Sequence, residues 1–179
     1  MNGEMISFAG NWLEADMNRL LFAAAMLAAF SIAPACADTK VGDWTVEKRT
    51  QDTHCNASRS YKDADDENNQ YGIVLSYSND RIVMVVIYEG WEWEKTGEIL
   101  KADFSSDNVD IMKKSKWEVM DKTTVRGVFE FDQAIVDAVS KAKRLSIDFE
   151  GDDDDSIELQ TPRAGEALAA LKYCEENKK

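Results

Sequence analysis

The single histidine, His54, lies directly beside Cys55, and these two side chains are the first candidates for chemistry. A cysteine nucleophile needs a histidine that can accept its proton. Neighbouring residues of a strand point to opposite faces, so this adjacency does not create a catalytic pair. The sequence also lacks G-x-S-x-G, H-E-x-x-H and a phosphate-binding glycine loop. These features argue against an enzyme, and they identify no catalytic residue, cofactor site or metal ligand.

Carboxylates are concentrated in two polar segments, residues 62–67 and residues 152–155. Clustered carboxylates can hold Ca²⁺, which takes about six to eight oxygen ligands. An EF-hand-like loop needs ligands at alternate positions, a central glycine and a distal glutamate, and neither segment has that spacing. Solvated turns are therefore the favoured interpretation. A calcium-stabilised module, in which the two loops converge, is one alternative.

Two tryptophans, Trp91 and Trp93, would lie on the same face of a strand because they are two residues apart. Such a pair could form a platform for a sugar or peptide ligand. A carboxylate-dependent glycan hydrolase would use this platform, although no motif locates its pair of acids. We favour core packing for both side chains, since large aromatic residues dominate small cores. The same holds for Trp44 and Trp117.

Residues 1–37 have the pattern of a secretory signal peptide. Arg19 supplies a positive charge, residues 20–32 are uncharged and largely apolar, and small residues at 35 and 37 suit a signal peptidase. We predict cleavage after Ala37, which discards Cys36; a lipoprotein anchored at Cys36 and a retained membrane helix are the alternatives. Residues 1–16 carry three acids and would be an unusual leader, which indicates a true start at Met17.

Export makes a disulfide the favoured interpretation of the two remaining cysteines. Cys55 and Cys174 lie far apart, form no C-x-x-C redox motif, and would enter an oxidising compartment. A bridge between them closes a loop of about 120 residues and stabilises the fold by up to ~4–5 kcal/mol in the chain-entropy treatment. We predict a single periplasmic or secreted domain over residues 38–179, with no stable membrane insertion after cleavage.

The composition is strongly acidic, with 34 acidic and 21 basic residues and a net charge of −13. Such a surface repels nucleic acid and anionic lipid. It favours solubility and either cationic partners or divalent ions.

Residues 38–160 mostly follow the two-residue period of strands. Residues 71–78 and 81–88 form a predicted hairpin around Asn79-Asp80, and the second strand is apolar on both faces, which suits a central strand covered on each side. Residues 91–104 are predicted as two short strands that meet at residues 95–97. Further predicted strands are 42–49, 116–131, 145–150 and 156–160, with Val125, Phe129 and Phe131 on one face.

Two helices follow at residues 132–144 and 161–174. Asp132 is the predicted N-cap of the first helix, and Thr161 and Pro162 are predicted to begin the second. Cys174 lies on the apolar stripe of the second helix, with Ala164, Ala167, Leu168 and Leu171. The predicted fold is mainly β: an antiparallel sandwich or curled sheet with two helices near the C-terminus.

The opening "VGDWTV", the cysteine about ten residues later and the closing helix of small residues and leucines resemble small periplasmic proteins of the invasion-associated locus B type. The resemblance implies an envelope or secreted protein that acts by binding. The leading hypothesis is an exported, non-catalytic domain whose partner is a protein or glycan of the cell envelope.

Overall fold

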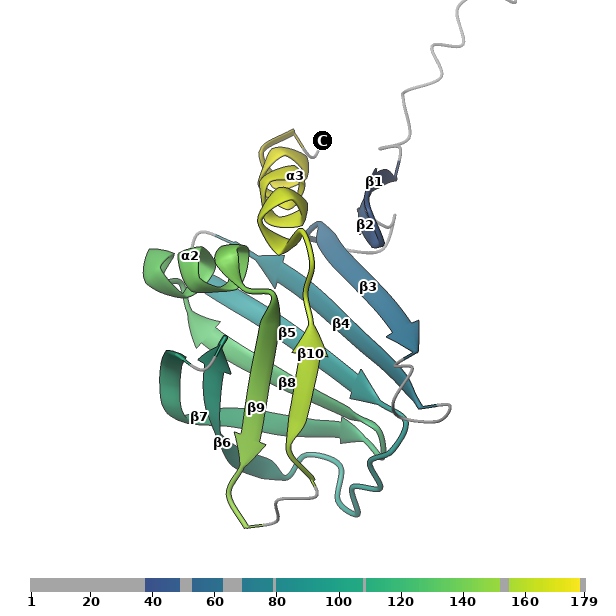
Figure 1. Ribbon diagram of the computed structural model, residues 1–179, viewed down its shortest axis with the longest axis vertical. Helices are drawn as coiled ribbons and strands as arrows, with labels where there is room; N and C mark the ends of the chain where they lie inside the picture. The colour runs from purple at the N-terminus through teal and green to yellow at the C-terminus, as the bar shows by residue number, and fades with distance from the viewer. Residues whose placement is uncertain are drawn as a thin grey trace, which may run out of the picture. The chain divides into compact units, whose positions relative to one another are not determined.

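Within the described residues, ten antiparallel strands form one open sheet in the computed structural model (Figure 1). Its order is β1-β2-β3-β4-β5-β8-β7-β6-β9-β10. The strands are β1 Thr39–Val41, β2 Trp44–Glu47, β3 Asn56–Lys62, β4 Gln70–Tyr77, β5 Arg81–Tyr88, β6 Ile99–Ser106, β7 Val109–Asp121, β8 Thr124–Glu130, β9 Arg144–Phe149 and β10 Ile157–Gln160. The predicted fold class is confirmed as a single curled sheet.

The structure describes residues 38–48, 53–62, 69–78, 80–107, 109–151 and 155–177. These residues belong to one compact unit that spans residues 36–179. The predicted signal peptide, residues 1–37, lies outside the described residues. Most of the two acidic segments, at 63–68 and 152–154, also lies outside them.

The predicted hairpins pair as the sequence indicates. β4 pairs with β5, and β9 pairs with β10, both antiparallel. On β5, Ile82, Met84 and Val86 are buried, while Val83 and Val85 on the other face are only partly buried. The central position of β5 is confirmed, but the prediction that both of its faces are covered is wrong. One face of the sheet therefore carries the core, and the outer face stays partly open.

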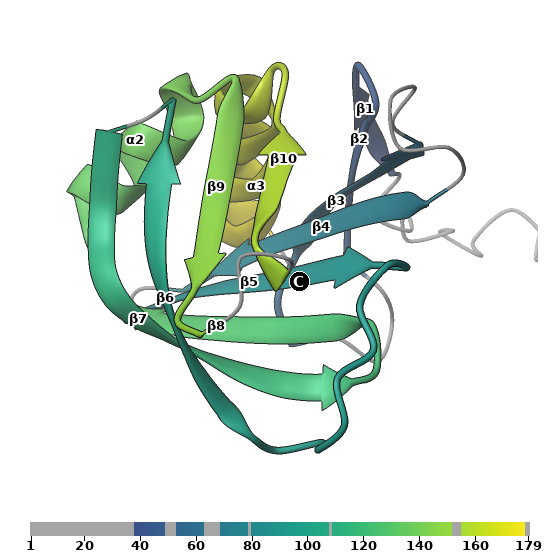
Figure 2. The same ribbon diagram turned by 60° about the horizontal axis from the view of Figure 1, so that its bottom comes forward.

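A bulge bends the sheet where β6 pairs with β7. Lys114 has a positive φ of 52° there, and the Asp103 carboxylate accepts hydrogen bonds from the Lys114 backbone (2.9 Å) and from Lys113 Nζ (3.0 Å). These bonds lower the pKa of Asp103. Because a bulge increases local twist, β9 and β10 turn back across β3, β4 and β5 (Figure 2).

Side chains of β3 hold the returning edge strand. Arg59, which is buried, donates from Nη1 to the Gln160 carbonyl at 2.7 Å and lies over the Tyr61 ring. The Tyr61 hydroxyl accepts from the Gln160 backbone N–H at 2.7 Å. Unpaired edge groups invite strand addition from other chains. Here the Arg59 and Tyr61 side chains bond to the carbonyl and the N–H of Gln160. This edge position is therefore occupied without an additional strand, although the sheet itself stays open.

Two described helices lie at one end of the curled sheet (Figure 1): α2, Gln133–Lys141, and α3, Ala164–Asn177. Asp132 caps α2 by accepting from the Ala134 N–H at 2.8 Å, as predicted. The predicted start of α3 is wrong. Thr161 is fully buried and its hydroxyl donates to the Ala142 carbonyl, so it does not cap the helix that begins at Ala164.

The two helices approach closely at Gly165. A Cβ atom added there would lie 2.7 Å from the Ser140 carbonyl oxygen, closer than packed atoms allow. Glycine therefore permits the backbone of α3 to pass against the end of α2. This close approach sets the width of the space between the helices.

The predicted apolar stripe of α3 is buried along its whole length, which confirms that prediction. Trp44 and Trp117 are fully buried, as expected. The strand predicted at residues 91–95 is absent from the described structure, because residues 91–98 form turns and irregular chain before β6. No described helix combines the length and the apolar character that crossing a membrane requires.

Candidate functional site

A surface groove runs between α2, α3 and the end of β4; we call it the α2–α3 groove. It has two connected parts of about 510 Å³ and about 230 Å³, which share Tyr77, Phe131 and Lys172. His54, Glu175 and Glu176 line the first part. The second part lies between the helices, beside Val136, Asp137, Leu168 and Ala169.

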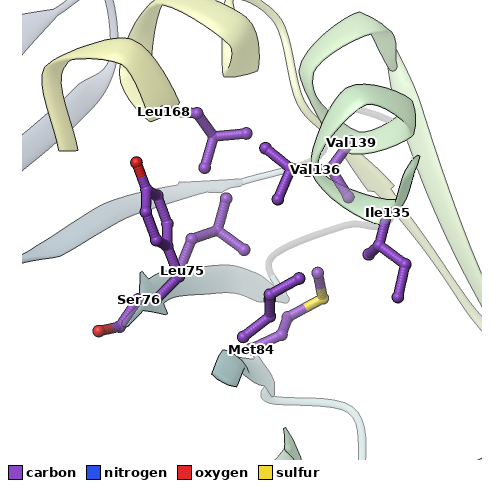
Figure 3. A pocket seen from close by; sticks show the side chains of 9 residues that line it. Leu75, Ser76, Met84, Ile135, Val136, Val139 and Leu168 are labelled. Carbon is purple, nitrogen blue, oxygen red and sulfur yellow. The ribbon is translucent and has the colours of Figure 1, made fainter. Parts of the chain in front are cut away.

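The floor of the groove is apolar. Below it lies a cavity of about 20 Å³, whose lining includes Tyr77, Val136 and Leu168 from the groove itself. Leu75, Met84, Ile135 and Val139 complete most of the lining and point toward one another from two strands and α2 (Figure 3). A void of this size and lining is just large enough for a single water and has few polar partners for it.

Two aromatic rings form the mouth. The Tyr77 and Phe131 rings are 6.1 Å apart between centroids and are tilted by 48°. Burial, followed by the charges of Glu176 and Glu175, raises the pKa of Tyr77 to about 12, so the phenol is neutral at physiological pH. Phe131 is 37% exposed. The sequence predicted Phe131 on one face of a strand with Val125 and Phe129, but β8 ends at Glu130, so Phe131 lies beyond the strand.

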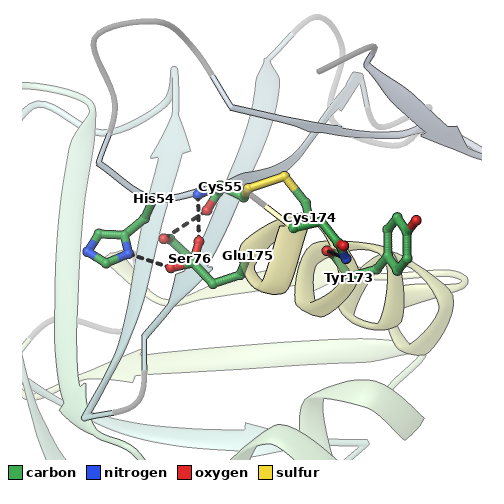
Figure 4. Close-up of a disulfide and its surroundings, with 7 residues drawn as sticks. His54, Cys55, Ser76, Tyr173, Cys174 and Glu175 are labelled. Atoms are coloured by element: carbon green, nitrogen blue, oxygen red, sulfur yellow. Dashed lines mark hydrogen bonds and ion pairs between the residues drawn. A yellow bond between two sulfur atoms is a disulfide. The ribbon is translucent and has the colours of Figure 1, made fainter. Parts of the chain in front are cut away.

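The predicted disulfide between Cys55 and Cys174 is present, with the two Cα atoms 6.1 Å apart (Figure 4). Beside it, Glu175 accepts from the Cys55 backbone N–H through Oε2 at 2.9 Å, and its Oε1 lies 2.7 Å from His54 Nδ1. Ser76 Oγ donates to the Cys55 carbonyl at 3.0 Å. The bridge and these bonds fasten the end of α3, which is one wall of the groove, to the start of β3.

Negative charge predominates around the groove. The described lining includes three acidic residues, Asp137, Glu175 and Glu176. Its basic residues are Lys172 and His54. An adjoining hollow that shares Phe131 adds Asp80 and Glu130 against Arg81. The hydrogen bond from Ser78, with a smaller contribution from Arg81, lowers the pKa of Asp80 and keeps it ionised. The groove thus combines an apolar floor with an anionic rim.

Trp91 cannot belong to an exposed ligand platform, because its side chain is buried. That indole is 2% exposed, donates from Nε1 to the Asp155 carbonyl at 2.9 Å, and packs against Tyr88 and Phe149. Trp93 is partly buried against Trp91 and Phe149. Neither lines the α2–α3 groove. Core packing, the favoured interpretation, is confirmed for Trp91.

Cys55 and His54 cannot act together as a cysteine nucleophile and its base. Cys55 is in the disulfide, and His54 is bound to Glu175. Among the described residues, no group of three or more His, Cys, Asp or Glu side chains is arranged to hold a metal ion. What the site offers is apolar contact surface and fixed charge.

Sequence reasoning did not find the groove. Tyr77 comes from β4, Leu168 from α3 and Phe131 from the link between β8 and α2, and each by itself looks like ordinary core. The one local signal was Phe131, an aromatic residue between the end of a strand and a helix N-cap. Comparisons of this chain with protein-family models, with curated proteins and with solved structures found no match.

Proposed function

We propose that this chain is an exported, non-catalytic domain that binds a partner in the cell envelope through the α2–α3 groove. The observation that carries the proposal is the groove itself, where Tyr77 and Phe131 open onto an apolar floor. The signal-peptide pattern and a disulfide that suits an oxidising compartment support export to the periplasm or beyond.

The groove is suited to binding because its floor can take an apolar side chain out of water. Burial of about 100 Å² of apolar surface is worth roughly 2.5 kcal/mol. Ligand sites are concave, largely apolar and furnished with a few polar groups that fix orientation. Glu175 already engages both oxygens with His54 and Cys55, so it serves as an anchor for α3.

The test blocks the groove at Ala169, an exposed residue of α3 that lines it. Ala169→Trp fills the space with an indole while keeping a residue that a helix accepts. We expect the variant, immobilised and exposed to envelope extract, to retain roughly tenfold less partner than wild type, which is about 1.4 kcal/mol of binding free energy. Quantitative mass spectrometry of the retained proteins and glycans provides the measurement.

Ala134→Trp is the matched control. Ala134 is an exposed alanine of α2 that does not line the groove, so the same bulk is added elsewhere. It should retain the partner at the wild-type level. If both variants retain the partner equally, the groove is not the binding surface, whereas equal loss in both would point to a general effect of added indole.

The glycan-hydrolase alternative has less support, because its platform residue Trp91 is buried. The calcium alternative depends on acidic segments that lie mostly outside the described residues. Binding through the groove remains the function that the described geometry favours.

A further inference from the structure

The end of α3 carries charges that oppose its helix dipole. The last turn of a helix has a partial negative charge and is stabilised by cations. The described last turn of α3 contains Glu175 and Glu176 and no basic residue. Glu175 is explained by its bonds to His54 and Cys55. Glu176 has only a long ion pair with Lys172, at 3.9 Å, and its side chain is 62% exposed.

A charge that costs local stability at an exposed position calls for another role. Glu176 and the helix end together create a negative potential at one end of the α2–α3 groove. Asp137 on α2 places a second carboxylate at the other part of the groove, where it accepts a hydrogen bond from Gln133 Nε2 at 2.8 Å. Tyr77, Phe131 and Lys172 line both parts, so one cation stands among the acidic residues of the rim.

This arrangement has an apolar centre with a carboxylate in each of its two parts. A small cation would use the charges and leave the floor empty, and a neutral apolar ligand would leave the excess negative charge of the rim uncompensated. A polypeptide can satisfy both features, because it presents one apolar side chain and charged neighbours at fixed spacing. Lys and Arg also have apolar stems that can lie along aromatic rings while their charged ends reach carboxylates.

We infer that the partner of the α2–α3 groove is a cationic polypeptide segment, which inserts one aromatic or aliphatic side chain over Leu168 and sets Lys or Arg beside Glu176 and Asp137. This inference rests on the proposed function, since it names the partner of the same groove. Residues 38–179 contain 31 acidic and 20 basic residues, and this excess of negative charge would draw such a segment toward the surface.

The test uses three labelled hexapeptides that share the Leu-Phe anchor and differ only in their flanks: acetyl-KKLFKK-amide, acetyl-SSLFSS-amide and acetyl-EELFEE-amide. Their binding to the protein purified from an exporting host is measured by fluorescence anisotropy at about 20 mM and about 300 mM salt. We expect the lysine-flanked peptide to bind roughly tenfold tighter than the serine-flanked one at low salt. The advantage should shrink at high salt, because exposed charges are screened.

Charge-reversal variants assign the effect to named residues. Glu176→Lys combined with Asp137→Lys should remove the advantage of the lysine flanks and leave the serine-flanked peptide unchanged. Glu92→Lys combined with Glu94→Lys, at exposed positions in the loop before β6, is the matched control and should preserve the advantage. The salt dependence on wild-type protein tests, without any variant, whether charge produces the preference.

The outcomes separate the inference from the proposed function. Equal affinity for the lysine and serine flanks, with both lost in Ala169→Trp, would overturn the cationic partner and leave the groove as the binding site. Preference for the glutamate flanks would also overturn it. If none of the peptides binds, the cationic-polypeptide inference fails, and the proposed function is then judged by the envelope-extract experiment alone.

Discussion

Replacing both Cys55 and Cys174 with alanine is expected to lower the free energy of unfolding by about 3–5 kcal/mol. The bridge spans 119 residues, so its loss releases a long loop in the unfolded chain. A domain of this size is stable by only about 5–15 kcal/mol, which makes the loss a large share of the total. Urea unfolding followed by tryptophan fluorescence gives the free energy.

Chemical reduction is the control for this prediction. Wild-type protein unfolded in the presence of dithiothreitol should match the double variant, and the double variant should not respond to dithiothreitol. Hydrogen exchange should locate the loosened region in α3, whose end the disulfide and Glu175 fasten to the start of β3. A loss below about 1 kcal/mol would show that the bridge adds little to the stability of this fold.

Replacing Trp91 with alanine is expected to destabilise the domain by about 3–5 kcal/mol, the usual cost of removing a large buried aromatic side chain. The indole is 2% exposed and packs edge-on against Tyr88 and Phe149, with ring centroids 5.6 and 5.8 Å apart. Its removal also leaves the Asp155 carbonyl without the indole donor. Thermal and urea unfolding measure the effect.

Two further variants test whether the loss of stability comes from the buried indole. Trp91→Phe keeps most of the bulk and loses the N–H, so it should cost less than the alanine variant. Glu92→Ala changes an exposed neighbour and should stay within about 0.5 kcal/mol of wild type. If Trp91→Ala retained full stability and lost only ligand binding, the indole would be a platform and the core assignment would be incorrect.

Elements with a strong local period were predictable from the sequence. The stripe of α3 and the alternation of Leu145, Ile147 and Phe149 on β9 each repeat at the spacing of their element. Asp132 caps α2 through a bond to Ala134, two residues away. The disulfide followed from counting cysteines, because only one pairing remained once Cys36 was predicted to belong to a cleaved signal peptide.

Features that depend on distant contacts were not predictable. Thr161 looks like a helix cap, but its hydroxyl donates a hydrogen bond to the carbonyl of Ala142, which tertiary folding brings next to it. Residues 91–95 alternate like a strand, but in the structure they form irregular chain. There the buried Trp91 donates a hydrogen bond from its indole to the distant Asp155 carbonyl. The groove needs Tyr77, Phe131 and Leu168 together, and no local pattern connects positions so far apart.

The most direct test of the binding groove is a map of amide chemical shifts. Labelled protein is titrated with acetyl-SSLFSS-amide, whose flanks carry no charge, so the map does not depend on the cationic inference. We expect shift changes at Tyr77, Phe131, Val136 and Leu168, around the groove. Changes confined instead to Val83, Val85 and Val128 on the outer face of the sheet would contradict the account.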